Sequence, residues 1–214
     1  MLFNLSDQNS IANQFISELR DRNIQQDRMK FRKNLERLGQ VMSYEISKTL
    51  SYQTSTVKTP LGISAVSLVT EKPVLITVMR AGLPYFQGFL DYFDNSDCGF
   101  IGAYRREGTD EVVVNLEYLT IPSIAGKIVI LIDPMLATGN SLVQSINALT
   151  AHGIPAHIHV AVLVAVPEGI EFLSRNIVHP HTLWTCAVDE TLNDKFYILP
   201  GLGDAGDLSF GEKL

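Results

Sequence analysis

The sequence has little of several features that define whole classes of protein. It contains only two cysteines, Cys98 and Cys186, in apolar stretches without the spacing of metal ligands, and we expect both to be buried reduced thiols. Its longest apolar run, residues 160–166, is too short to span a bilayer. The first residues lack the charged and apolar regions of a signal peptide. We therefore expect a soluble protein of the cytoplasm that has no membrane partner.

Positive charge is also scarce. The chain has 17 Lys and Arg against 23 Asp and Glu, a formal net charge of −6, which argues against a broad nucleic-acid surface. There is no P-loop, no Gly-x-Ser-x-Gly nucleophile elbow and no dinucleotide fingerprint. The five histidines do not have the spacing of a zinc site, so we interpret them as surface or core residues.

What the chain does have is length and apolar content for a full core. With 214 residues, 46% hydrophobic, it suits one α/β domain. Apolar runs predict strands at residues 74–79, 99–104, 127–132, 157–166 and 183–188, with a further extended piece at 111–118. Helices are predicted between them at residues 83–93, 141–152 and 168–175. This alternation predicts a mostly parallel central sheet flanked by helices.

The first third of the chain differs from this pattern. Residues 10–50 have apolar residues at three- and four-residue spacing and predict an N-terminal helical hood. Residues 51–70, rich in Ser, Thr and Val, predict a β-arm. No linker divides the chain, so we expect one domain, residues 1–214, with its core in residues 73–214. The arm and the hood could each pack against a second copy.

The most informative segment follows the strand at 127–132, and we name it the 133–141 turn. It consists of Asp133, Pro134, Met135, Leu136, Ala137, Thr138, Gly139, Asn140 and Ser141. A strand that ends on an acid, turns through small and hydroxyl residues and enters a helix is typical of a sugar-phosphate site. Open N–H groups at the helix start favour a dianion, and Asp133 suits ribose hydroxyls because a carboxylate only accepts hydrogen bonds. Helix capping alone would explain Asn140 or Ser141 but not the residues before them.

Two arginines follow other strands. Arg80 lies directly after the strand at 74–79, beside Ala81 and Gly82, and this arrangement suits a pyrophosphate because a guanidinium gives forked hydrogen bonds. Arg105 follows the strand at 99–104 in the same way, next to Arg106. Adjacent strand residues face opposite sides, so the two differ in role, and the sequence does not choose between them. An ordinary surface arginine is the alternative at each position.

The third element is the 197–207 tail, Tyr-Ile-Leu-Pro-Gly-Leu-Gly-Asp-Ala-Gly-Asp. Its glycines predict a tight loop whose backbone N–H and C=O groups can recognise the edge of a flat heterocycle. A frayed terminus is the alternative, which the embedded Ile198, Leu199 and Pro200 disfavour.

Together these residues resemble the uracil phosphoribosyltransferases. The 133–141 turn is similar to that family's phosphoribosyl loop, with Asp133-Pro134 where most phosphoribosyltransferases have two adjacent acids, and the 197–207 tail is similar to its uracil loop. Residues 31–32, 80–83, 104–105 and 165–170 also match in order, so the resemblance spans nearly the whole chain. It implies a type I phosphoribosyltransferase fold and the joining of uracil to 5-phosphoribosyl 1-diphosphate, giving UMP and diphosphate.

The resemblance also implies a role for each matched position. Asp133 would hold the ribose hydroxyls, residues 134–136 would line the site, and residues 137–141 would surround the 5′-phosphate. Arg80 and Arg105 would contact the diphosphate, and Mg²⁺ would be held mainly by substrate and water. Backbone groups of Ile198, Gly203 and Ala205 would bind uracil. Asp204 would lie near the reacting ribose, with Arg80 and Asp204 as the catalytic residues.

The chain departs from the family pattern in places. Asn140 stands where a second glycine is usual, and residues 107–122 follow the pattern poorly. The resemblance implies a homodimer or higher homo-oligomer, and GTP binding as in some relatives, but the N-terminal arginines do not locate such a site. Two rival functions stay open: a non-enzymatic regulator that senses a nucleotide and binds RNA, and an enzyme of the same fold that acts on another base.

Overall fold

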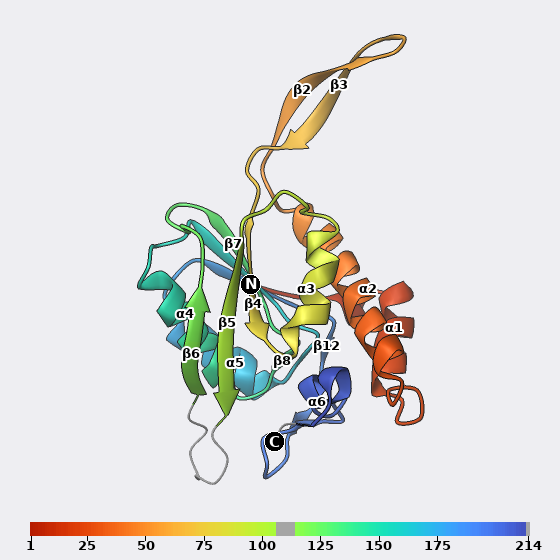
Figure 1. Ribbon diagram of the computed structural model, residues 1–214, viewed down its shortest axis with the longest axis vertical. Coiled ribbons are helices and arrows are strands. Elements are labelled where there is room, and N and C mark those ends of the chain that lie inside the picture. Colours follow the sequence, from red (N-terminus) through yellow and green to blue (C-terminus); the bar gives the residue numbers. More distant parts are fainter. Residues whose placement is uncertain (106–113, 213–214) are drawn as a thin grey trace.

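The protein is built around a mostly parallel sheet. The computed structural model describes residues 1–105 and 114–212, and only the backbone of residues 103–105 and 114–117. Within these residues the main sheet has seven strands in the order β1-β11-β9-β7-β4-β5-β6 (Figure 1). The strands are β1 (Leu2–Asn4), β4 (Val74–Met79), β5 (Cys98–Arg105), β6 (Val114–Thr120), β7 (Ile128–Ile132), β9 (His157–Ala161) and β11 (His181–Thr185). All neighbours are parallel except β5 and β6, so the predicted sheet is confirmed.

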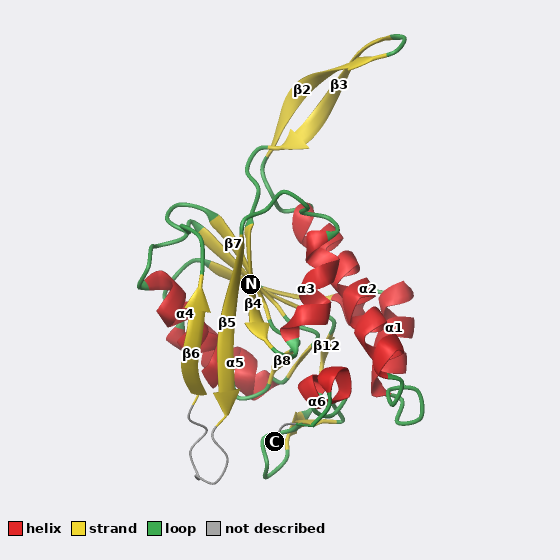
Figure 2. Cartoon of the chain, viewed as in Figure 1, coloured by secondary structure: helices red, strands yellow, loops and turns green. Residues whose placement is uncertain are grey.

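Helices cover both faces of this sheet (Figure 2). On one side lie α1 (Ile11–Arg20), α2 (Arg28–Ser47) and α3 (Gly82–Leu90), and on the other lie α4 (Asn140–Thr150) and α5 (Pro167–Asn176). Successive strand residues enter different cores: Leu75 packs with the α2 and α3 side chains, whereas Ile76 packs with those of α4. Continuous apolar strands are therefore buried on both faces, as parallel strands require.

The N-terminal stretch predicted to be helical, residues 10–50, forms two helices. The chain turns between Arg20 and Arg28, where the Asp21 carboxylate accepts the N–H of Asn23 at 2.8 Å. The Asp27 carboxylate then caps α2 by accepting the N–H groups of Met29 and Lys30, both at 3.0 Å. Two short aspartate side chains, which bond locally to the backbone, thus separate the helices.

Three strands are interrupted near their carboxyl ends and resume as a second parallel sheet. In the described part of the chain this sheet contains β8 (Met135–Leu136), β10 (Val164–Ala165) and β12 (Ala187–Val188). The prediction of single strands at 157–166 and 183–188 is therefore wrong, because each is divided into two strands. The Pro134 carbonyl accepts the N–H groups of both Leu163 and Val164, at 2.9 and 3.2 Å, so the register slips as in a bulge.

The predicted β-arm is a hairpin of β2 (Tyr52–Thr59) and β3 (Gly62–Val69). It projects from the end of the molecule opposite α6 (Figure 1). Its tip residue Leu61 is fully exposed, and Ile63 is 79% exposed. Most residues of both strands of the hairpin are therefore exposed.

The chain ends with the short hairpin of β13 (Thr191–Leu192) and β14 (Ile198–Leu199), followed by α6 (Ala205–Phe210). The 3-10 turn η1 (Leu5–Asp7) completes the elements near the N-terminus. No helix in the described residues combines the length and apolar character needed to cross a membrane.

Candidate active site

The 133–141 turn leaves the central strand β7 and leads into α4. The N–H of Asp133 donates to the Ala161 carbonyl of β9 at 3.1 Å, and the Asp133 carboxylate accepts the N–H of Met135 at 3.3 Å. Pro134 and Leu136 are buried, whereas Asp133 and Met135 stay partly exposed. The turn is thus anchored to the sheet with its acid facing partly outward, at the edge where open α/β sheets bind ligands.

The first turn of α4 is open to an acceptor. Gly139 is the N-cap, with a φ of +87° that favours glycine, and it has no side chain to cap the helix. The N–H of Asn140 has only a long contact, 3.4 Å, to the Thr138 hydroxyl. Among the described residues we find no hydrogen-bond partner for the N–H groups of Ser141 and Leu142. Helix capping by Asn140 or Ser141 therefore does not account for this turn, and the open N–H groups suit an anion.

A small, open hollow lies at the same place. It is lined by Met135, Leu136, Ala137, Thr138, Gly139, Ser141 and Leu142. The open N–H groups of α4 and a concave surface therefore coincide.

Helix α5 supports the turn from below. A β-carbon on Gly169 would lie 2.1 Å from the Ala137 carbonyl oxygen, and one on Gly139 would lie 3.1 Å from the Gly169 carbonyl oxygen. Glycine at both positions lets the backbone of α5 contact the backbone of the turn directly. Gly169 belongs to residues 165–170, which matched the family pattern without an assigned role. These residues thus pack directly beneath the 133–141 turn.

Arg80 leaves the sheet beside Asp133. Strands β4 and β7 are paired with Thr77 opposite Ile132, and the Thr77 hydroxyl donates to the Ile132 carbonyl at 3.2 Å. Arg80 comes three residues after Thr77, and Asp133 comes directly after Ile132. The Met79–Arg80 peptide bond is cis. Both side chains therefore start from the carboxyl edge of neighbouring strands, as the sequence predicted.

The Arg80 guanidinium also contacts the end of the chain. It donates to the Asp207 carboxylate at 3.1 Å and to the Gly211 carbonyl at 3.4 Å, and it is 40% exposed. Arg80 therefore connects the β4 edge to α6, which lies at the same end of the molecule as the arrowhead of β5 (Figure 1).

Arg105 is the last residue of β5, paired with Val114 of β6. Strand β5 continues three residues beyond Gly102, which is opposite Met79. The side chain of Arg105 and the whole of Arg106 lie outside the described residues, as do residues 107–113. The choice between the two arginines stays open.

The 197–207 tail is more regular than the predicted tight loop, because its last residues begin α6. The Asp204 carboxylate caps this helix by accepting the N–H groups of Gly206 and Asp207, at 2.8 and 3.0 Å. An aspartate before a helical turn is a start signal that the sequence offered. Among the described residues the N–H of Ala205 has no partner. Gly203 is exposed, whereas Ile198 and Ala205 are buried.

Sequence reasoning missed three residues that hold the tail in place. Arg20, Gln25 and Asp189 all bind backbone groups of Gly201 or Leu202. Asp189 follows the apolar run at 183–188 just as Asp133 follows β7, so the same signal was present there.

The histidines and cysteines lie elsewhere. His159 is buried and accepts the Trp184 indole N–H at 3.0 Å, and burial lowers the pKa of His159 to about 4. Cys186 is buried, and burial raises the pKa of its thiol to about 12. Cys98 is only partly buried, so the expectation that both cysteines are buried was wrong for Cys98. Both thiols are free. The described residues contain no group of three or more His, Cys, Asp or Glu placed to hold a metal.

The chain is similar to known proteins over its full length. A model of the family described as uracil phosphoribosyltransferase matches residues 6–212. A uracil phosphoribosyltransferase of Porphyromonas gingivalis is 44% identical over 214 residues, which cover 100% of this chain and 99% of that protein. One of Methanothermobacter thermautotrophicus is 38% identical over 206 residues, which cover 95% of this chain and 93% of that protein.

A solved structure, AQ2163 from Aquifex aeolicus, superposes with a TM-score of 0.88 at 31% identity and covers 100% of both chains. The same fold therefore occurs with a sequence that has diverged at most positions. From the family match and the full-length relatives, we conclude that this chain belongs to the uracil phosphoribosyltransferase family.

Proposed function

We propose that this protein transfers the phosphoribosyl group of 5-phosphoribosyl 1-diphosphate to N1 of uracil, giving UMP and diphosphate. Such an enzyme is a glycosyltransferase that transfers a pentose, and it returns a free pyrimidine base to nucleotides. The observation that carries the proposal is the open first turn of α4, which borders a hollow and follows Asp133 at the sheet edge.

The 5′-phosphate would bind the turn itself. The open N–H groups of Ser141 and Leu142 and the hydroxyls of Thr138 and Ser141 are donors suited to a dianion, and the dipole of α4 favours negative charge there. Residues 134–137 and Asn140 would shape the walls. Asp133 would accept the ribose hydroxyls at the mouth of the turn.

Arg80 and Arg105 would bind the diphosphate. Arg80 is partly exposed and held by Asp207 and Gly211 in an ion pair that water reaches, so its guanidinium can exchange this partner for a phosphate. This exchange would free α6 from Arg80 when the substrate binds.

Uracil would be bound by backbone groups of Ile198, Gly203 and Ala205. Its edge alternates carbonyl acceptors with an N–H donor, so peptide N–H and C=O groups match it without a charged side chain. The Ala205 N–H, for which the described residues offer no partner, is one such donor.

In the reaction, the bond from the anomeric carbon to the diphosphate oxygen breaks, the bond to N1 forms, and the proton of N1 passes to the released diphosphate or to water. Positive charge develops on the ribose and negative charge on the departing diphosphate. Arg80 and Arg105 would stabilise the leaving group, Asp133 and the 133–141 turn would fix the ribose, and Asp204 would face the reacting carbon. Mg²⁺ chelated by the substrate would add positive charge at the diphosphate. We expect this ion to be held mainly by substrate and water, as Mg²⁺ usually is in phosphate-binding sites.

A homodimer or higher oligomer belongs to this proposal. The hairpin of β2 and β3 projects from the rest of the molecule (Figure 1) and exposes Val57, Leu61, Ile63 and Leu68. A second copy would cover these side chains. GTP activation and a cytoplasmic location stay predictions.

The direct test is to incubate the purified protein with labelled uracil, phosphoribosyl diphosphate and Mg²⁺ and to measure UMP, with and without GTP. Parallel reactions with cytosine, adenine and hypoxanthine test the rival enzyme. Asp133→Asn should lower turnover strongly. The matched control is Asp97→Asn, because Asp97 is exposed at the opposite edge of the sheet, where it pairs with Lys127 at 3.0 Å.

The two rivals predict different results. An enzyme for another base would give a nucleotide only with that base. A regulator would give no nucleotide under any condition and would bind RNA, which the net charge of −6 disfavours. Either result would overturn the proposal.

A further inference from the structure

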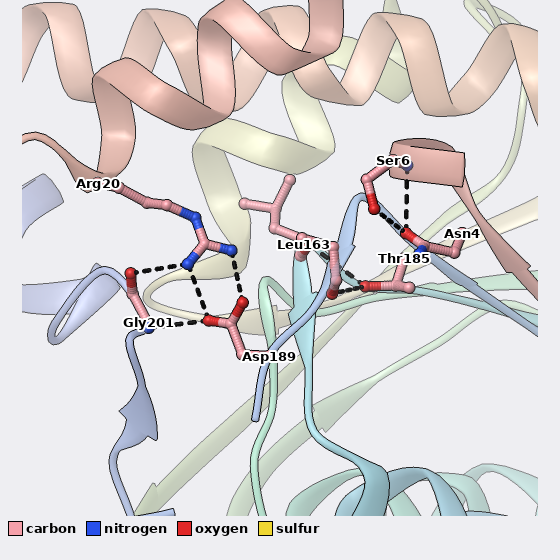
Figure 3. Close-up of polar contacts among 8 residues, drawn as sticks. Asn4, Ser6, Arg20, Leu163, Thr185, Asp189 and Gly201 are labelled. Atoms are coloured by element: carbon pink, nitrogen blue, oxygen red, sulfur yellow. Dashed lines mark hydrogen bonds and ion pairs between the residues drawn. The ribbon is translucent and has the colours of Figure 1, made fainter. Parts of the chain in front are cut away.

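A buried ion pair outside the substrate-binding residues holds the middle of the 197–207 tail. The Arg20 guanidinium binds the Asp189 carboxylate through two hydrogen bonds of 2.7 and 2.9 Å, and their side chains are only 22% and 6% exposed (Figure 3). The same two side chains bind Gly201. Asp189 accepts its N–H at 2.8 Å, and Arg20 donates to its carbonyl at 3.3 Å. Both backbone polar groups of Gly201 are thus fixed by one ion pair.

The two partners are anchored on different layers. Arg20 ends α1, and Asp189 directly follows β12, where its own N–H donates to the Ala165 carbonyl of β10 at 2.8 Å. The ion pair therefore joins the N-terminal helical layer to the carboxyl edge of the second sheet, with Gly201 between them.

Gly201 has a backbone conformation that only glycine readily adopts. Its φ is +60°, and a β-carbon there would lie 2.2 Å from the Ile198 carbonyl oxygen. It lies between Ile198 on one side and Gly203 and Ala205 on the other, the three residues whose backbone is proposed to bind uracil. A shift at Gly201 would therefore move both halves of that binding surface.

A second contact acts on the next residue. The Gln25 amide donates to the Leu202 carbonyl at 3.1 Å and to the Leu19 carbonyl at 2.7 Å. Consecutive carbonyls of the tail thus each accept a hydrogen bond from this region: Gly201 from Arg20 at the end of α1, and Leu202 from Gln25 in the segment that joins α1 to α2. These hydrogen bonds hold the backbone of Gly201 and Leu202, next to the groups that are proposed to bind uracil.

We propose that Arg20 and Asp189, assisted by Gln25, are positioning residues that set the affinity for the base by holding Gly201 and Leu202. They act through the backbone, because Asp189 is 7% exposed and bound to Arg20 and Gly201. The inference rests on the proposed function. Base contacts tolerate little displacement, so loosening this attachment weakens uracil binding more than it weakens phosphoribosyl diphosphate binding.

The test separates the two substrates. Arg20→Lys keeps the charge but loses the fork, and the double variant Arg20→Met with Asp189→Leu removes both charges so that neither is left buried alone. We expect KM for uracil to rise about tenfold or more in the double variant, as for loss of hydrogen bonds to charged groups. KM for phosphoribosyl diphosphate should stay within about twofold, and Arg20→Lys should lie between the double variant and the wild type.

Gln25→Ala provides a variant that keeps the ion pair and the fold. It should raise KM for uracil a few-fold, whereas Gln26→Ala, at the exposed neighbouring position, should leave it unchanged. Ile158→Ala controls for lost stability. It removes a core side chain of β9 that is 1% exposed, and it should lower the melting temperature while changing neither KM.

Three outcomes would overturn the inference. If the wild type makes UMP but the variants have an unchanged KM for uracil, the inference is wrong and the proposed function is unaffected. Parallel rises in both KM values, as a general loosening would give, would also remove the inference. A wild type that makes no UMP would overturn the proposed function and this inference together.

Discussion

The α-carbon of Gly169 lies against the carbonyl of Ala137 so closely that a β-carbon would be 2.1 Å from the Ala137 oxygen. The first residues of α5 and the 133–141 turn are therefore in backbone contact. Because neither backbone can yield like a flexible side chain, a change in one must move the other.

Gly169→Ala should therefore disturb the turn. We expect KM for phosphoribosyl diphosphate to rise at least about tenfold, with the stability loss of about 1–3 kcal/mol typical of overpacking. Steady-state kinetics and urea denaturation measure these two effects. Gly62→Ala is the matched control, because a β-carbon there meets no atom within 4 Å. Normal KM in the Gly169 variant would contradict the supporting role of α5.

Asp204→Asn should lower turnover strongly and leave stability almost unchanged. Asparagine caps a helix about as well as aspartate, so α6 should persist while the carboxylate charge that is proposed to face the ribose is lost. The comparison is Asp27→Asn, since Asp27 caps α2 through the same pair of backbone bonds. Turnover of the Asp204 variant close to wild type would remove this residue from the catalytic set.

Arg80→Ala should also lower turnover strongly with little cost in stability. Its ion pair with Asp207 has side chains 40% and 32% exposed, and such pairs contribute less than about 1 kcal/mol. Arg175→Ala is the control. It removes a more exposed arginine, 72% exposed, that pairs with Glu171 on α5. If both variants keep normal kcat, Arg80 does not act on the leaving group.

His159 predicts a loss of stability in acid. Burial lowers the pKa of His159 from 6.5 to about 4. Between pH 6.5 and pH 4 the imidazole is therefore protonated in the unfolded chain but neutral in the folded one. The contribution of His159 to the free energy of unfolding is therefore largest above pH 6.5 and falls by about 3 kcal/mol on acidification to pH 4. The neighbouring His157, whose ring centroid is 4.7 Å away, contributes in the same direction, because burial lowers its pKa too.

Urea denaturation at several pH values measures this contribution as the difference between wild type and His159→Gln. That difference should change between pH 6.5 and 4, whereas His152→Gln, at an exposed position, should follow the wild type throughout. Parallel curves for the wild type and the His159 variant would show that this imidazole does not stay neutral.

Tyr85→Phe should be neutral or stabilising by up to about 1 kcal/mol, which is unusual for a fully buried residue. The Tyr85 hydroxyl is buried, and among the described residues it has no hydrogen-bond partner. Its removal thus eliminates the cost of a buried, unpaired hydroxyl and leaves no hydrogen-bond partner unsatisfied. Tyr44→Phe, 53% exposed, should have no effect in the same thermal denaturation assay. A clear loss of stability at Tyr85 would contradict the unpaired hydroxyl.

Much of the site was visible before the fold was known. The acid after β7, the glycine at the start of α4 and the arginine after β4 are local signals, because strand ends and helix starts are determined by neighbouring residues. The helical end of the tail was missed although Asp204 marks it, because the three glycines around it favoured a loop. The strand interruptions were missed because they come from a shift in register between neighbouring strands, which the sequence of a single strand does not reveal.

By itself the sequence determined the mostly parallel sheet, the 133–141 turn and the order of elements along the chain, because apolar runs and capping residues act over a few positions. Only the tertiary structure decided that Arg20 meets Asp189, 169 residues away, and that both hold Gly201. The physical reason is that buried ion pairs form where layers close on one another, and the partner of a charge depends on which surfaces the core brings together.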